Sequence, residues 1–326
     1  MASIILKLSI QLLPIHLDIS MSFLEHGLRA KVMSTELIIE ANLSKKILFE
    51  ALEIAKEFER KYSAYQEESL LCHINAHSGM HPTLCTPDEL EIFHLAKKIA
   101  QQSNGRFDPT IGSLTQGLYG FGKKEARIPE PDELNATQAL VNYKNIILDN
   151  QSIFLQKKGM KLDLGGIGKG YVADKIFSFL SSKGATKILI CVGGEIAATG
   201  KVYKIAIKNP FNHGNMAIVT TTKEQLSIST SGDYERFIGS RLHHHILDNK
   251  TAKQNHFYAS ITIIKNDINT TLLDAVATIA FNAPLNQLEA IAQKFDVAII
   301  AITPQKKIVV ENFQNLALEN LELFPF

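Results

Sequence analysis

The sequence of 326 residues contains no tryptophan and only three cysteines, which are Cys72, Cys85 and Cys191. An odd number of cysteines without paired spacing argues against a disulfide framework and against a cysteine-bound zinc ion, so we expect free thiols. An excess of charge of one sign is also missing, because 34 Lys and Arg residues nearly balance 33 Asp and Glu residues. This balance gives no indication of nucleic-acid binding, and the length suits one large domain or two closely packed lobes.

A membrane-spanning run is missing as well. The stretch 4–13 is apolar but interrupted, and it ends at Pro14, so it is too short to cross a bilayer. It has neither a basic region before it nor a small-residue cleavage site followed by cysteine. We expect a soluble protein without a clear membrane anchor, located in the cytoplasm in preference to the periplasm. Residues 1–30 are predicted to be an N-terminal extension, either disordered or a mis-assigned start with Met21 as the alternative, and residues 31–326 the folded domain.

The pattern of apolar residues predicts a mixture of helices and strands. Helical spacing predicts a helix over 43–62 with Ser44 as its N-cap, and a capping box at 86–89 opens a second helix that ends at 104–105. A weaker pattern predicts a third helix over 171–183. Further along, we expect strands at 187–192, 202–208, 217–222 and 258–265, helices at 271–282 and 285–295, and a hairpin at 297–303 and 307–312. Because no regular βαβ alternation is present, the predicted fold class is α+β.

Four glycines and a lysine are concentrated in the segment 163–171, between a predicted strand and a predicted helix. Such a loop lets backbone N–H groups approach an anion. A Walker loop is excluded because Asp163 stands in place of its first glycine and Gly170 in place of its Ser or Thr. A dinucleotide fingerprint is excluded because Tyr171 stands in place of its third glycine. The segment is therefore either an anion-binding loop of another kind or only a tight turn.

Asp274 and Thr278 lie four residues apart in a predicted helix, so they share one face of it. A carboxylate and a hydroxyl are hard oxygen donors that suit magnesium, which also accepts phosphate oxygens and waters. The alternative is an ordinary amphipathic helix in which the Thr278 hydroxyl bonds back to the carbonyl of Asp274. Spacing alone leaves both interpretations open.

Three consecutive histidines occupy positions 243–245. In an extended segment neighbouring side chains alternate, so at most two of these rings can serve one pocket. A zinc site would need a further ligand that the sequence does not offer. A general base or a phosphate-contacting imidazole remains one interpretation, and a surface cluster the other.

Taken in chain order over residues 31–312, these segments resemble the ApbE family, the FAD:protein FMN transferases. Each segment alone is a weak signal, but eight of them in the family's order and spacing form a strong one. The resemblance is carried by residues 33–35, 62–65 with 69 and 74–75, 105–110, 163–171, 193–196, 231–236, 244–248 and 274–278.

The resemblance implies a mixed α/β fold of two closely packed lobes around one FAD molecule. It places flavin contacts near Met33, Tyr65, Arg106, Phe107, Asp108, Asp163, Lys169 and the backbone of Ile246 and Leu247. It places Mg²⁺ on the side chains of Asp274 and Thr278 and the backbone of Gly166 and Ala277. It implies that Asn75 affects the balance between transfer and hydrolysis and that His245 assists the acceptor hydroxyl, so the predicted catalytic residues are His245, Asp274 and Asn75.

The reaction implied is magnesium-dependent cleavage of the FAD pyrophosphate, with FMN transferred to a Thr or Ser of a flavoprotein and release of AMP. The acceptor would carry an Asp-Gly-x-Ser/Thr-Gly-Ala-Thr type of segment. The only Gly-Ala-Thr of this chain, at 184–186, follows Leu180-Ser-Ser-Lys, so we do not expect self-modification. Two alternatives remain: a metal-dependent FAD pyrophosphatase that yields FMN and AMP, and a catalytically inactive flavin-binding protein.

The sequence departs from the family pattern at two positions of interest. Ser34 stands where the family has glycine, and it would be strained if its φ angle were positive. Asn249 stands where the family has proline, so the loop after Asp248 is predicted to lie differently. Neither change removes a predicted metal ligand, and we expect activity to survive.

Overall fold

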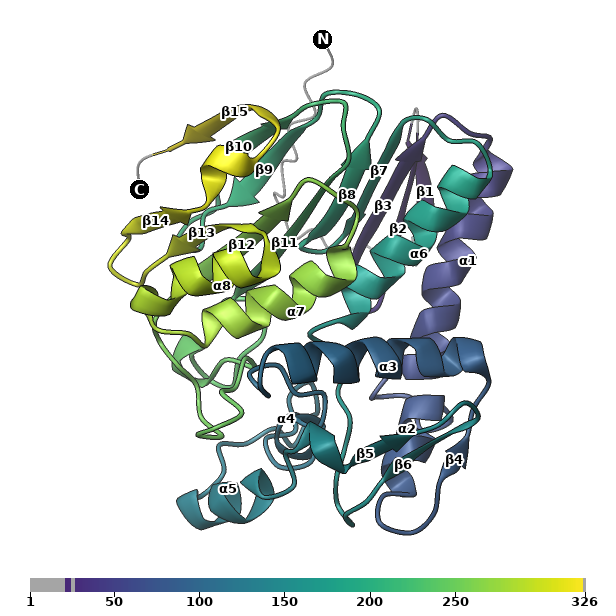
Figure 1. Cartoon of the computed structure of the whole chain (residues 1–326), viewed down its shortest axis with the longest axis vertical. Helices are drawn as coiled ribbons and strands as arrows, with labels where there is room; N and C mark the ends of the chain where they lie inside the picture. Colours follow the sequence, from purple (N-terminus) through teal and green to yellow (C-terminus); the bar gives the residue numbers. More distant parts are fainter. Residues whose placement is uncertain (1–20, 25–26, 325–326) are drawn as a thin grey trace.

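The computed structural model describes residues 21–24 and 27–324, which form a larger and a smaller lobe (Figure 1). The larger lobe is built on a nine-stranded sheet in which each strand is antiparallel to its neighbours. Its order is β1 (Met21–Leu24), β2 (Gly27–Val32), β3 (Thr35–Ala41), β7 (Ile188–Val192), β8 (Glu195–Thr199), β11 (Leu226–Gly232), β12 (Ser260–Lys265), β13 (Ala298–Ile302) and β14 (Ile308–Glu311).

Both faces of the central part of this sheet are covered, which explains why β7, β12 and β13 are buried along nearly their whole length. One face packs against the helices α1 (Lys45–Tyr62), α6 (Gly168–Ser182), α7 (Thr270–Phe281) and α8 (Leu288–Phe295), which lie side by side in Figure 1. The other face packs against a small sheet of β15 (Leu318–Leu323), β10 (Asn215–Thr221) and β9 (Lys204–Lys208). Strand β3 shows the alternation: Leu37 and Ile39 join the core beneath the helices, whereas Ile38 joins the core beneath the small sheet.

The smaller lobe combines short helices with a three-stranded sheet. Its helices are α2 (Leu70–Ala76), α3 (Pro87–Gln102), α4 (Gly112–Thr115) and α5 (Pro131–Gln138), and its strands are β4 (Thr83–Leu84), β6 (Ser152–Leu155) and β5 (Ile146–Leu148). A separate hydrophobic cluster joins Leu114, Tyr119 and Phe121 of this lobe to Leu247 and Ala252 of the long loop between β11 and β12. That loop therefore packs across the boundary between the lobes.

The α+β class is confirmed, and most predicted elements are present with shifted ends. The predicted capping box of α3 is complete, because Thr86 and Glu89 each bond the other's backbone. Ser44 is the N-cap residue of α1, but its side chain makes no capping bond. The segment predicted as one helix over 285–295 is a short 3-10 turn, Leu285–Gln287, followed by α8.

Helix α6 begins at Gly168, earlier than the predicted start at residue 171. Its glycines fit inside the helix because α7 approaches closely: a Cβ atom on Gly170 would lie 2.2 Å from the carbonyl oxygen of Thr270. A side chain there would push the two helices apart. The glycines that we read as a loop signal therefore serve helix packing as well.

The large sheet begins within the segment that we predicted to be an extension. Strands β1 and β2 pair with each other and with β3, and Leu28 is fully buried. Residues 1–20 of the predicted extension lie outside the described residues. Among the described residues, the helices are all too short or too polar to cross a membrane.

Candidate functional site

The glycine loop and helix α7 meet at the boundary between the lobes. The backbone N–H of Gly170 donates to Asp274 Oδ2 at 3.1 Å. One turn further along α7, a Cβ atom on Gly166 would lie 3.2 Å from the hydroxyl oxygen of Thr278. The side chains of Asp274 and Thr278 thus face the same loop, as the predicted metal site requires. Ala277, whose carbonyl is the other predicted ligand of α7, is fully buried between them.

Lys169 lies between two buried carboxylates. Its Nζ atom forms an ion pair with Glu195 of β8 and lies 3.6 Å from Asp274 Oδ1. Burial works to lower the pKa of Lys169, but the charges of Asp274 and Glu195 outweigh it and raise the pKa above its usual value. Burial raises the pKa of Glu195, and Lys169 opposes that rise. Two acidic groups thus share one ammonium in a buried cluster.

This cluster fits a divalent cation. Glu195 Oε2 is buried and has no hydrogen-bond partner among the described residues, which leaves an electron-rich atom beside Asp274 and Lys169. Asp274 and Thr278 supply a carboxylate and a hydroxyl, and the backbone of Gly166 and Ala277 can supply carbonyl oxygens. Magnesium prefers such oxygen donors and completes its shell with waters and phosphates. Among the described residues, no group of three or more His, Cys, Asp or Glu side chains that could hold a metal ion is present.

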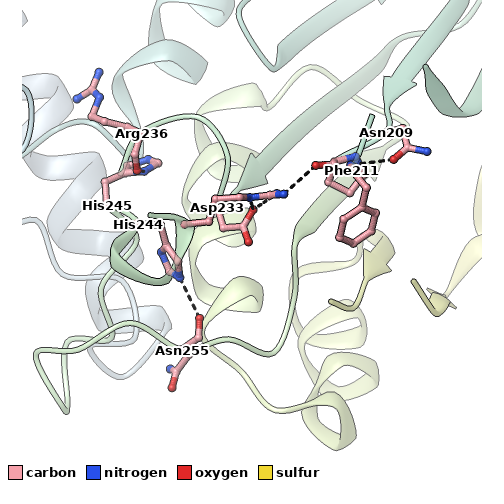
Figure 2. A network of polar contacts seen from close by, with 9 residues as sticks. Asn209, Phe211, Asp233, Arg236, His244, His245 and Asn255 are labelled. Atoms are coloured by element: carbon pink, nitrogen blue, oxygen red, sulfur yellow. Dashed lines mark hydrogen bonds and ion pairs between the residues drawn. The ribbon is translucent and has the colours of Figure 1, made fainter. Parts of the chain in front are cut away.

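The structure separates the histidines into two different environments (Figure 2). His244 is fully buried, bonds the carbonyl of Asn255 through Nε2 and packs edge-on against Phe281. His245 is partly exposed, and both its backbone N–H and its Nδ1 lie 3.0 Å from the carbonyl oxygen of Arg236. Because a carbonyl can only accept, Nδ1 carries the proton and Nε2 keeps its lone pair.

The His245 ring is held neutral. Although part of the residue is accessible, the surrounding protein desolvates the ring and lowers its pKa to about 4, and the charges of Arg236 and Lys169 add to the effect. The influence of Lys169 links this ring electrostatically to the carboxylate cluster on the glycine-loop side. A neutral ring with a free Nε2 lone pair is chemically able to accept a proton.

The segment before the glycine loop is fixed by contacts with the smaller lobe. Asn75 accepts from the N–H of Leu162 at 2.7 Å and donates to the carbonyl of the same residue at 3.1 Å. Asp163 accepts from the hydroxyl of Thr115 at 2.6 Å and from the N–H of Gly165 at 2.7 Å. Asn75 thus holds the backbone of Leu162, which directly precedes Asp163 and the glycine loop.

The remaining predicted flavin contacts lie on both lobes. Met33 forms, with Ser34, the two-residue turn between β2 and β3, and its Cε atom lies 3.8 Å from a Cβ position on Gly168. The Tyr65 ring is about half exposed, at 49%. Ile246 is buried in the main core, so its side chain packs against the protein.

The turn after α3 is held mainly by its own side chains. Asp108 is buried and accepts from the N–H and hydroxyl of Thr110 and from the N–H of Tyr143. Three hydrogen bonds thus hold this carboxylate within its own turn. Phe107 is buried with its ring 3.4 Å from a Cβ position on Gly166, and Arg106 bonds the side chain of Gln287.

Comparison with known proteins decides the family. The sequence model described as the ApbE family matches residues 29–302. The chain belongs to the ApbE family. An FAD:protein FMN transferase of Klebsiella pneumoniae is 31% identical over 83% of this chain and 86% of its own length, and one of Treponema pallidum is 28% identical over 80% and 78%. The crystal structure of an ApbE protein of Thermotoga maritima superposes with a TM-score of 0.81 at 26% identity, covering 90% of this chain and 99% of that one.

The structure accounts for both departures from the ApbE pattern. Ser34 has a φ angle of +59°, so the strain expected for a residue in place of glycine is present. Asn249 uses its side-chain amide to donate to the carbonyls of Gly105 and Arg106, both at 3.0 Å. It therefore ties the loop after Asp248 to the smaller lobe, which proline could not do.

Four residues that contact the predicted site were not assigned to it from sequence: Thr115, Glu195, Arg236 and Asn249. Glu195 and Arg236 lie inside segments that carry the family resemblance, but no role was assigned to either side chain from the sequence. Asn249 was noted only because it stands where the family pattern has proline. Nothing in the local sequence marks Thr115.

Proposed function

We propose that the protein transfers the FMN half of FAD to a threonine or serine hydroxyl of an acceptor flavoprotein and releases AMP in a magnesium-dependent reaction. The observation that carries the proposal is the meeting of Asp274, Thr278 and the glycine loop beside the ammonium of Lys169, whose charge also acts on His245. The relatives named FAD:protein FMN transferase support it, because they match most of this chain.

Each group has a chemical task in this proposal. Mg²⁺, held by the side chains of Asp274 and Thr278 and the carbonyls of Gly166 and Ala277, would neutralise charge that develops on the pyrophosphate. The ammonium of Lys169 contributes a second positive charge in the same buried cluster. Gly166 keeps side-chain bulk away from the Thr278 hydroxyl, because a Cβ atom there would lie 3.2 Å from it.

The transfer step forms one bond and breaks one. The acceptor hydroxyl oxygen attacks the phosphorus of the FMN half, and the bond from that phosphorus to the bridging oxygen breaks, so AMP leaves with the bridging oxygen. His245 Nε2 takes the hydroxyl proton, since its partner nitrogen is already committed to Arg236. The flavin side chains Met33, Tyr65, Arg106 and Phe107, with Asp163, would hold the isoalloxazine and ribityl parts in line for this attack.

An acceptor assay tests the proposal. Purified protein is mixed with FAD, Mg²⁺ and a polypeptide that carries an Asp-Gly-x-Thr-Gly-Ala-Thr segment, and covalent flavin is read as in-gel fluorescence. We expect a fluorescent acceptor band that is lost when the last threonine of the acceptor is replaced by alanine or when Mg²⁺ is chelated. A dark acceptor at saturating FAD contradicts the proposal. Release of free FMN and AMP without acceptor would instead identify a pyrophosphatase.

A further inference from the structure

Arg236 contacts both sides of the boundary between the lobes. Its carbonyl oxygen accepts the backbone N–H and the Nδ1–H of His245, each at 3.0 Å. Its guanidinium donates from Nη1 to the hydroxyl of Tyr65 at 3.0 Å, across 171 residues of sequence. Figure 2 shows the Arg236 side chain pointing away from the Asp233 network, on the far side of His245. One residue thus joins the proton acceptor to a predicted flavin contact.

The surroundings of the Tyr65 hydroxyl allow its oxygen to accept the hydrogen bond from Arg236. It donates its own proton to the carbonyl of Phe121 at 3.0 Å, which leaves its lone pairs for Arg236. A Cβ atom on Gly122 would lie 2.8 Å from the same hydroxyl oxygen, so a glycine is needed beside it. The ring is therefore fixed at its polar end while 49% of the residue stays exposed.

The fold of the segment 236–245 does not depend on this guanidinium. Arg241 anchors the segment separately by pairing with Asp233 and donating to the carbonyl of Pro210. Within the segment, the N–H of Ile238 bonds the carbonyl of His243 at 3.1 Å. The Arg236 side chain is exposed and forms no ion pair with a carboxylate among residues 21–24 and 27–324. An exposed, unneutralised arginine that bonds a tyrosine across the site has little structural purpose of its own.

We propose that Arg236 is a positioning residue for the transfer reaction, whose guanidinium clamps Tyr65 of the smaller lobe at a fixed separation from His245 of the larger lobe. The inference rests on the proposed function. It adds that this bond contributes to closure of the lobes at the flavin end, beside the bonds of Asn249 to Gly105 and Arg106, and that the Arg236 carbonyl sets the orientation of the His245 ring.

The test combines FAD binding, steady-state kinetics and a double-mutant cycle. In Arg236→Met the bond to Tyr65 is lost, so we expect KM for FAD to rise about 3- to 10-fold, the usual worth of one hydrogen bond. Tyr65→Phe should give a similar rise in KM for FAD. The double variant should raise KM no further than either single variant does. Arg236→Lys, which keeps a donor and the charge, should restore part of the loss.

A second measurement reports on the charge of Arg236 and would not respond to a structural role. The charged or titratable groups that act on His245 are Arg236, Lys169 and His244. Removing the positive charge in Arg236→Met should move the acid limb of the kcat/KM profile to higher pH, while Arg236→Lys leaves it in place. Arg29→Met, an exposed arginine of β2 that pairs with Glu36, is the matched control and should shift neither quantity.

The outcomes separate this inference from the proposed function. FAD binding, followed by quenching of flavin fluorescence, does not require the acceptor, so it tests the clamp even if transfer is absent. Independent, additive effects of Arg236→Met and Tyr65→Phe, or an unchanged affinity for FAD with an unchanged acid limb, would overturn the inference. A wild-type protein that binds FAD but never labels an acceptor would instead overturn the proposed function alone.

Discussion

The two halves of the candidate site are built in different ways. The half that we propose to hold the metal, called the metal half below, lies within the larger lobe, where regular elements place Lys169, Glu195 and Asp274 in a buried cluster. The proton-accepting half lies on irregular loops, where His245 and Tyr65 come from different lobes and are joined through Arg236. The first half is therefore preorganised by core packing, whereas the second depends on how the lobes sit against each other.

The difference has a physical reason. A cation needs several oxygen atoms held within a few tenths of an ångström, and helix packing provides that rigidity. An acceptor protein has to reach the reacting phosphorus, so the groups that meet it have to stand at an accessible edge. Changes in the metal half should thus abolish the reaction, and changes in the other half should weaken it or alter its pH dependence.

The largest effect is expected from Asp274→Asn. The amide can still accept from the N–H of Gly170, so the packing of α6 on α7 should survive, but the charge that attracts the cation is lost. We expect the transfer rate to fall about 1,000-fold, equivalent to about 4 kcal/mol of transition-state stabilisation. Thermal unfolding provides the control for folding. A variant with near-normal turnover would show that the metal half is wrongly assigned.

His245→Ala should have a smaller effect and slow the transfer about 100-fold. A base with so low a pKa gives a rate enhancement at the lower end of the range for general-base catalysis. The neutral ring is the active form, so kcat/KM of the wild type should stay level from pH 7 down to about pH 5. It should fall only as the pH approaches about 4, where the ring becomes protonated. Magnesium and FAD affinity should not change in the variant. A wild-type acid limb near pH 6.5 would contradict the account of His245.

A substitution of His244 should affect the stability of the fold and not catalysis. Burial lowers its pKa to about 4 from an ordinary value of 6.5, so the unfolded state binds more protons in this range. The contribution of neutral His244 to the free energy of unfolding is fully present above pH 6.5. It is lost as the pH falls towards 4, by roughly 2–3 kcal/mol. His244→Gln should reduce this pH dependence in chemical unfolding experiments, and the exposed His213→Gln should not. Equal slopes for all three proteins would show that His244 is not buried in the neutral form.

The smallest effect concerns the turn that carries Met33. Ser34 has a positive φ angle, and a glycine there should stabilise the protein by about 0.5–1 kcal/mol once its greater chain entropy is subtracted. Urea unfolding measures this, and Ser22→Gly, in strand β1, should be neutral or destabilising. A Ser34→Gly variant that is less stable than the wild type would show that the backbone at Ser34 is not strained.

The sequence predicts the placement of Asp274 and Thr278 better than the contacts of the other half because the spacing of these two residues is local. Asp274 and Thr278 are one helical turn apart, so helix geometry alone brings them to one face. The contacts of Asn75 with Leu162 and of Arg236 with Tyr65 join residues 87 and 171 positions apart, and no local pattern encodes them. The β2–β3 hairpin was also missed, because Met33 and Ser34 lack the Asn-Gly signature of a turn with two positive φ angles.

The central claim is that Asp274 and Thr278 together hold a divalent cation at the FAD diphosphate. Thr278→Val removes only the hydroxyl, and Thr220→Val, in the buried strand β10, is a matched control. The decisive measurement is a Mn²⁺ titration in the presence of FAD, followed by electron paramagnetic resonance. The account predicts that Thr278→Val needs about 10-fold more Mn²⁺ for half-saturation, one ligand's contribution, and that the control behaves as wild type. Identical titrations for all three proteins would contradict it.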